Sequence, residues 1–90
     1  MTNTKAVRTG KLFANNGGLC DYLALGYLER GGDRIPCKIG YNDYEDIDGV
    51  IEPIFVFIQE DGVTDSGNHY SKETINLARC SIDVATEISL

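Results

Sequence analysis

The sequence contains no tryptophan, and its one methionine is the first residue. If the chain binds a partner through large anchoring side chains, these must be Tyr, Phe, Leu or Arg. Long apolar runs are absent as well, since the longest, Ile54–Ile58, falls far short of the roughly 20 residues that span a bilayer. The first residues show no apolar signal core, and no Asn-x-Ser/Thr acceptor occurs. We therefore expect a soluble, cytoplasmic protein.

Cysteines are few and far apart: Cys20, Cys37 and Cys80 are odd in number and form no closely spaced pair. A disulfide framework needs an even set in an oxidising compartment, and structural zinc sites normally use close pairs. We expect three reduced thiols that behave as small buried hydrophobic groups, with no metal and no cofactor.

Catalytic patterns are also missing. Asn15-Asn16-Gly17-Gly18 lacks the spacing of phosphate-binding loops and indicates a tight turn. His69 lies near Asp65 and Ser66, as a hydrolytic triad would require, but no nucleophile-elbow pattern accompanies them. The sequence therefore predicts a protein that is not an enzyme.

Ninety residues leave room for one hydrophobic core, so we expect residues 1–90 to form a single domain. The segment from Tyr22 to Tyr41 has the pattern of a β-hairpin. Apolar residues alternate on both sides of the turn Arg30-Gly31-Gly32-Asp33, beginning at Leu23 and at Ile35. Pro36 favours an edge position for the second arm, because proline donates no ladder hydrogen bond. An amphipathic helix over Leu19–Arg30 stays open as the alternative for the first arm.

Further along, Val50–Gln59 is rich in β-branched and aromatic residues. Its part Ile54–Ile58 has apolar groups on both faces, which is typical of a central strand. Ser71 is a suitable cap for a short helix through Arg79. Strict alternation then predicts a strand over Cys80–Leu90, with a continuous carboxy-terminal helix as the alternative. The pattern as a whole predicts an α+β domain, in which an antiparallel β-sheet of about four strands packs with one or two short helices.

Charge is spread unevenly. Residues 1–38 carry a net charge of +3, whereas residues 39–70 contain eight acids and no Lys or Arg. That central field repels nucleic-acid phosphates and attracts a basic surface, so we expect a protein partner and no direct contact with nucleic acid or membrane.

The densest part of the acidic segment runs from Asn42 to Glu52. Its spacing partly matches a calcium loop of the EF-hand family, but with Gly49 at the glycine position Tyr44 and Phe55 occupy ligand positions. We therefore expect no specific calcium site. A solvated loop that serves solubility is one interpretation, and a protein-binding surface is the other. The predicted partner-binding residues are the acids and tyrosines of this segment: Tyr41, Asp43, Tyr44, Glu45, Asp46, Asp48 and Glu52.

Regularly spaced carboxylates on an ordered platform can stand in for phosphates and block the basic groove of a nucleic-acid-handling enzyme. In general character, the small size, acidity and lack of catalytic motifs resemble the small acidic inhibitors that phages use against restriction or CRISPR systems. The sequence therefore predicts a non-enzymatic inhibitor or adaptor. The alternative is a small oligomerisation module that pairs edge strands such as Ile35–Tyr41 or Cys80–Leu90, with no inhibitory role.

Overall fold

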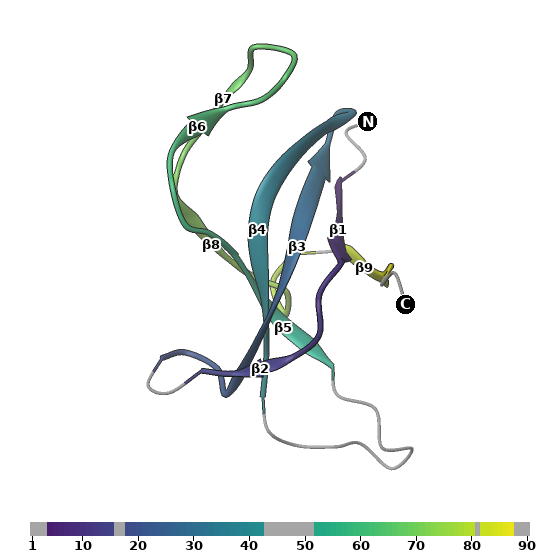
Figure 1. The fold of residues 1–90 in the computed structure, drawn as a ribbon, viewed down its shortest axis with the longest axis vertical. Coiled ribbons are helices and arrows are strands. Elements are labelled where there is room, and N and C mark those ends of the chain that lie inside the picture. Colours follow the sequence, from purple (N-terminus) through teal and green to yellow (C-terminus); the bar gives the residue numbers. More distant parts are fainter. Residues whose placement is uncertain (1–3, 16–17, 43–51, 81, 88–90) are drawn as a thin grey trace.

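The computed structural model describes residues 4–15, 18–42, 52–80 and 82–87, and these residues form strands, turns and bends without any helix. Figure 1 shows a strongly twisted sheet with an additional hairpin that extends from one side. The strands are β1 (Thr4–Arg8), β2 (Phe13–Ala14), β3 (Tyr22–Arg30), β4 (Asp33–Tyr41), β5 (Pro53–Ile58), β6 (Gly62–Val63), β7 (His69–Tyr70), β8 (Glu73–Asn76) and β9 (Asp83–Thr86).

The main sheet has seven strands in the order β8-β5-β4-β3-β1-β9, and β2 pairs with β3 beside β1. Neighbouring strands are antiparallel except for β1 and β9, which run parallel. The strands β6 and β7 form a separate two-stranded sheet. The fold class expected from the sequence is therefore wrong: the described chain is an all-strand, mixed sheet and not an α+β domain with helices.

The predicted hairpin is present as β3 and β4, with Arg30 opposite Asp33. Gly31 and Gly32 have φ values of 59° and 87°, as the two central residues of a type I′ turn require. This two-residue connection fixes the register of the whole hairpin, so Leu28 faces Ile35 and Leu25 faces Lys38. The helix considered for residues 19–30 is excluded over Tyr22–Arg30.

The helix predicted over Ser71–Arg79 is replaced by β8 and a turn. Ile75 is buried opposite Val56, so pairing with the central strand β5 outweighs the local capping signal of Ser71. The turn begins at Asn76, whose side-chain oxygen accepts a hydrogen bond from the Ala78 amide at 2.9 Å. Tertiary pairing has overridden a helical pattern that was short and weakly amphipathic.

The predicted carboxy-terminal strand is present only as β9, within the described part of Cys80–Leu90. Ile82 and Val84 pack against the core as the alternation predicts, whereas Cys80 and Thr86 are exposed. The strand stops contributing to the core because β1, its parallel partner, ends at Arg8 opposite Thr86.

Pro36 does not make β4 an edge strand along its whole length, because β4 lies between β3 and β5. The pairing of β4 with β5 covers only Lys38–Tyr41, however. The first half of β4, which contains Pro36, has β3 as its only strand partner among the described residues. The proline therefore marks the point where the sheet edge becomes free.

The hydrophobic core covers one face of the sheet, here called the inner face. Its largest fully buried side chains are Leu28, Ile39, Val56 and Ile58. Half-buried side chains pack against this cluster, among them Leu12 and Leu77 from connecting segments and Tyr70 from β7. These segments thus cover the inner face of the sheet, where helices were expected. The opposite face, here called the outer face, is available for other contacts.

Candidate protein-binding surface

Most of the predicted partner-binding residues, Asp43, Tyr44, Glu45, Asp46 and Asp48, lie outside the described residues. Glu52 lies among the described residues, directly before β5, and it is exposed. Tyr41 is only 3% exposed and belongs to the core cluster. The structure thus places its ring in the core rather than on a surface beside the acidic segment.

Arg8 explains how the core accepts the polar end of Tyr41. The guanidinium carbon of Arg8 lies 5.7 Å from the centre of the Tyr41 ring. Burial raises the pKa of the Tyr41 phenol, while a hydrogen bond to Arg8 and the charge of Arg8 act in the opposite direction. The pair joins β1 to the end of β4 and is a structural contact.

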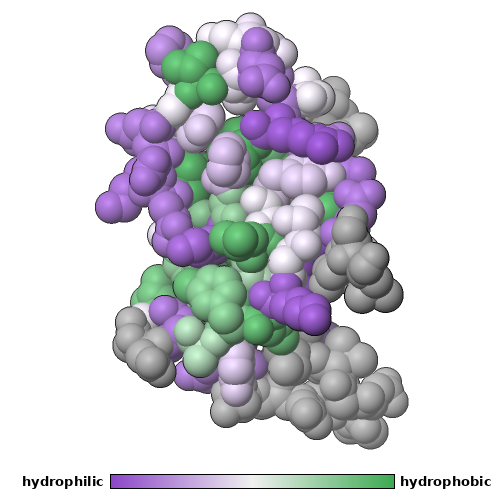
Figure 2. Space-filling view, viewed as in Figure 1, coloured by the Kyte–Doolittle hydropathy of each residue, from purple (hydrophilic) through white to green (hydrophobic). Residues whose placement is uncertain are grey.

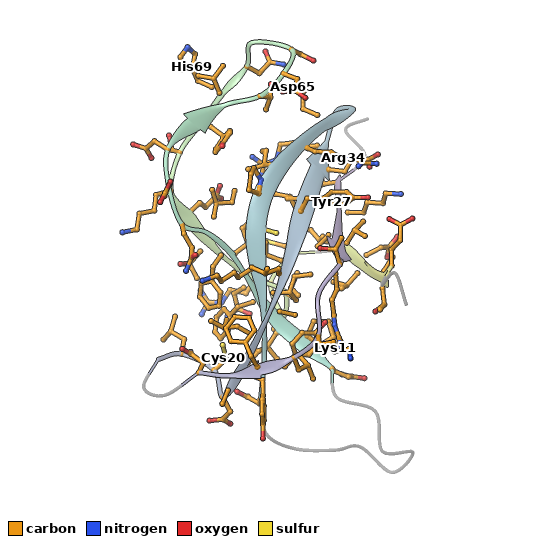
Figure 3. The ribbon with its side chains drawn as sticks, viewed as in Figure 1. Lys11, Cys20, Tyr27, Arg34, Asp65 and His69 are labelled. Atoms are coloured by element: carbon orange, nitrogen blue, oxygen red, sulfur yellow. The ribbon has the colours of Figure 1, made fainter. Side chains whose placement is uncertain are left out.

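The described acids of the negative central segment do not form one cluster. Glu52 precedes Pro53, which pairs with Tyr41 at one end of β4, whereas the loop that contains Asp65 contacts Asp33 at the other end. A nine-residue strand spans about 27 Å, so Glu52 and Asp65 are far apart. Figure 3 shows Asp65 at the end of the molecule away from Cys20 and Lys11. Among the described residues, the carboxylate platform that the sequence suggested is not assembled.

The outer face of the sheet carries an apolar surface that the sequence analysis did not identify. Strand register places Phe13, Leu23, Gly40 and Phe55 in one row across β2, β3, β4 and β5. Leu25, Lys38 and Phe57 form the next row. We call the side chains of these two rows the outer-face patch: Phe13, Leu23, Leu25, Lys38, Phe55 and Phe57. In Figure 2, apolar side chains gather over this part of the sheet, with hydrophilic side chains around them.

Two members of the outer-face patch are prominently exposed, Phe13 at 42% and Leu25 at 55%. The Lys38 ammonium nitrogen lies 5.9 Å from the centre of the Phe13 ring, so a cation stands within the apolar surface. The ring centres of Phe55 and Phe57 are 5.6 Å apart, so the two aromatic side chains pack against each other along β5. Exposed aromatic and aliphatic side chains of this kind are typical of the core of a protein interface, whereas a lysine such as Lys38 is more common at its rim.

The connection between β2 and β3 holds one end of this surface in place. The side-chain amide of Asn15 donates to the Cys20 carbonyl at 3.0 Å, and the Asp21 amide donates to the Tyr41 carbonyl at 3.0 Å. These bonds seat Cys20 over Gly40, where any larger residue than glycine would meet the Cys20 sulfur. Burial raises the pKa of the Cys20 thiol, so this cysteine acts as a packing group.

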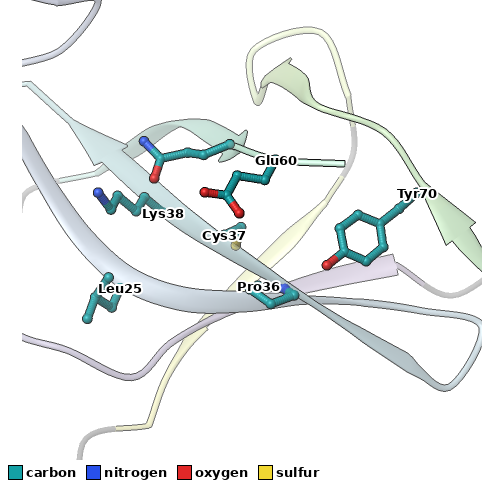
Figure 4. Close-up of a pocket in the computed structure, with 7 residues that line it drawn as sticks. Leu25, Pro36, Cys37, Lys38, Glu60 and Tyr70 are labelled. Atoms are coloured by element: carbon teal, nitrogen blue, oxygen red, sulfur yellow. The ribbon is translucent and has the colours of Figure 1, made fainter. Parts of the chain in front are cut away.

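A cleft of about 210 Å³ adjoins the outer-face patch where β5 separates from β4. Leu25, Pro36 and Lys38 form its sheet side, and Gln59, Glu60 and Tyr70 form the opposite side. In Figure 4 the Tyr70 hydroxyl points across the cleft toward Pro36 and Cys37. We call this space the edge cleft, because it lies at the free edge of β4.

The cysteines considered for metal binding are not brought together, and Ser66, which was considered for catalysis, contacts a residue outside the set proposed with it. The side chain of Ser66 hydrogen-bonds to Asp33. Cys20 lies on the outer face, Cys37 in the core, and Cys80 is exposed. Within the described ranges, no group of three or more His, Cys, Asp or Glu side chains is placed to hold a metal ion.

Comparison of the chain with models of protein families, with curated proteins and with solved structures finds no match. In the described part of the chain there is no helix long and apolar enough to cross a membrane.

Proposed function

We propose that this chain is a non-enzymatic protein-binding domain, an inhibitor or adaptor, that docks through the outer-face patch. The observation that carries the proposal is the exposure of Phe13 and Leu25 beside Lys38 on one face of the sheet. Burying a fully exposed Phe or Leu side chain contributes about 1.5–3 kcal/mol. Phe13 and Leu25 are 42% and 55% exposed, so docking gains about half of that from each, and the neighbouring side chains of the outer-face patch add the rest of the contact. The adjoining edge cleft offers space for one side chain of the partner.

The negative central segment supports a partner with a basic surface. Residues 39–70 contain eight acids and no Lys or Arg, and Glu52, Glu60 and Asp65 are exposed. Such a field speeds association with a positively charged protein. In this proposal, the acidic segment steers the encounter and the outer-face patch supplies the lasting contact. The partner is then a protein with a basic surface, such as a nucleic-acid-handling enzyme, and the three free thiols favour action in the cytoplasm.

The docking surface is tested with the double variant Phe13→Ser/Leu25→Ser. Wild type and variant serve as baits for extracts of the source cells, and the partner that wild type retains is purified for Kd measurement. We expect at least about a tenfold loss of affinity for the double variant, because both apolar anchors are removed.

Val63→Ser is the matched control, because Val63 is 53% exposed but lies on β6, away from the outer-face patch. It should leave the Kd unchanged. Equal affinity of wild type and double variant, both folded by circular dichroism, would show that docking uses another surface.

Electrostatic steering is tested by Asp46→Lys/Asp48→Lys. With the same purified partner, we expect association to slow by at least about tenfold at low salt and the difference to shrink at high salt, because screening weakens the charge attraction. Stopped-flow or surface plasmon resonance gives the rate. An unchanged association rate at low salt would remove the steering role and leave the outer-face patch as the whole interface.

The alternative is an oligomerisation module. Among the described strands, β8 and β9 end the strand order of the main sheet, and the first half of β4 also has a free edge. β9 and this part of β4 are therefore available for pairing, whereas the second half of β4 is already paired with β5. Light scattering separates the two proposals, because a concentration-independent monomer excludes the module.

A further inference from the structure

Residues 59–70 form an arm that leaves the end of β5 and carries the hairpin of β6 and β7 before the chain returns at β8. Its two strands pair only with each other, Gly62 with Tyr70 and Val63 with His69. Figure 1 shows this arm as a separate hairpin beside β4, and it does not extend the main sheet. We call residues 59–70 the strap.

The strap runs beside an edge of β4 that pairs with no other strand among the described residues. Alternate residues of an antiparallel ladder direct their backbone groups to the same neighbour. The Leu25 carbonyl accepts hydrogen bonds from the amides of Thr9 and Gly10, so it points away from β4. Its ladder partner is Lys38, and by alternation Arg34 and Pro36 also direct their backbone groups away from β3.

Pro36 explains why β5 does not continue along this edge. Proline has no amide proton, and here it occupies a position whose amide would face β5. The ladder ends at Lys38 and Phe57, and the strap departs from there. The amide of Arg34 and the carbonyls of Arg34 and Pro36 are left facing the strap with no strand partner in the described part of the chain.

Asp33, the first residue of β4, ties the far end of the strap to the sheet. The Asn68 side-chain amide donates to the Asp33 carboxylate at 2.6 Å. Side-chain hydrogen bonds from Ser66, Asn68 and Thr64 hold the pKa of Asp33 below its ordinary value, so the carboxylate is charged at neutral pH. We call this contact between the side chains of Asn68 and Asp33 the Asp33 latch.

The strap loop is ordered for this contact. The Thr64 amide donates to the Asn68 carbonyl at 2.8 Å, and the Thr64 hydroxyl accepts from the Asn68 amide at 3.1 Å. At the base of the strap, the Lys72 amide donates to the Asp61 carboxylate at 2.7 Å. The base of the strap is thus held by its covalent connections to β5 and β8 and by the hydrogen bond between Asp61 and Lys72. Its far end is held by the hydrogen bond between Asn68 and Asp33.

Tyr70 stands between the strap and the edge of β4. It lines the edge cleft, and it also lines a second cleft of about 240 Å³ that contains Asp33, Ile35 and Asn68. Its half-buried ring packs against the core, and the Cys37 thiol lies in the edge cleft beside it. Burial raises the pKa of Cys37 to about 12, as expected for a thiol shielded from water.

We propose that the strap is a hinged cover over the free edge of β4, held closed by the Asp33 latch, and that its opening withdraws Tyr70 and exposes the edge together with Cys37. Few apolar contacts join the far half of the strap to the sheet, because residues 65–69 are all exposed. Segments of this kind open locally without global unfolding. The closed strap protects an edge that would otherwise pair with extended segments of other chains.

The two buried cysteines allow a direct test. Cys37 lies beside the strap, while Cys20 lies over Gly40 on the outer face, so each reports on a different region. Two proteins are made that each keep one of these thiols, with the other cysteines replaced by Ala. The rate of labelling by a thiol-specific reagent is measured under native conditions at one pH, with and without Asp33→Ala.

We expect Asp33→Ala to speed labelling of Cys37 by at least about tenfold and that of Cys20 by less than about twofold, because only the strap opens. Asp65→Ala, an exposed acid of the same loop, is the matched control and should change neither rate. Asn68→Ala removes the donor from the other side and should reproduce the effect of Asp33→Ala. An unchanged Cys37 rate overturns the proposal, and so does an equal rise for both thiols, which indicates global unfolding.

Discussion

Leu28→Ala is expected to lower the free energy of unfolding by about 2–5 kcal/mol, the range for removing a large aliphatic side chain from a closed core. Leu28 is completely buried on β3, with Ala6 of β1 opposite on one side and Ile35 of β4 on the other. Because both neighbouring strands are hydrogen-bonded in place, they cannot close around the missing atoms, and a cavity remains.

Leu25→Ala is the matched control for this variant. It changes the same residue type on the same strand, but Leu25 points to the outer face and is 55% exposed. Its loss should cost well under half as much, because most of the side chain already contacts water. Urea denaturation followed by circular dichroism gives both values. If the two variants lose equal stability, the inner face is not the main core.

Gly26→Ala is expected to lower the free energy of unfolding by about 3 kcal/mol or more, at or beyond the upper end of the usual cost of overpacking. A β-carbon at Gly26 would collide with the backbone carbonyl oxygen of Val7 and would lie 3.2 Å from the Ile39 methyl carbon. The obstacle is the backbone of β1, so a side-chain rotation cannot relieve the collision. The strand β1 must move, and its parallel partner β9 with it.

Gly40→Ala provides the comparison for Gly26→Ala. A β-carbon there would meet the Cys20 sulfur at 2.6 Å and a Phe57 ring carbon at 2.8 Å, and both obstacles are side chains. Phe57 is half-buried on the outer face and can turn, so we expect a smaller loss of stability. Thermal and urea unfolding of the two variants measure the difference. A larger loss for Gly40→Ala would mean that β1 adapts more easily than the outer face does.

The candidate site was only partly visible in the sequence. Ile54–Ile58 has apolar residues on both faces, which predicts that the face turned away from the core is apolar as well. Phe55 and Phe57 do lie on that face, in the outer-face patch. The alternation that begins at Leu23 indicates a strand, but it does not show which side of that strand faces the core. The structure places Ala24 and Leu28 in the core and leaves Leu25 exposed, because the register of the hairpin turns Leu25 toward the side of Lys38.

The acidic segment shows the opposite difficulty. Its charge is plain in the sequence, but whether charges act together depends on the distance between them, which composition does not contain. Asp61 accepts a hydrogen bond from the Lys72 amide at the base of the strap, while Glu52 and Asp65 are separated by the length of β4. The number of acids along the chain therefore predicted a negative electrostatic field, but it did not predict which carboxylates lie together on one surface.

The sequence by itself determined the turn at Gly31-Gly32, the second arm of the hairpin and the strand character of Ile54–Ile58, because positive-φ glycines and β-branched residues act on the backbone where they stand. The strand character of the first arm was decided by its pairing with β1 and β4. Only the tertiary structure decided that Glu73–Asn76 is a strand, that β9 runs parallel to β1, and that Leu25 faces outward. Each of these depends on a partner strand distant in the sequence, and the energy of pairing and burial there exceeds the local preference of the segment.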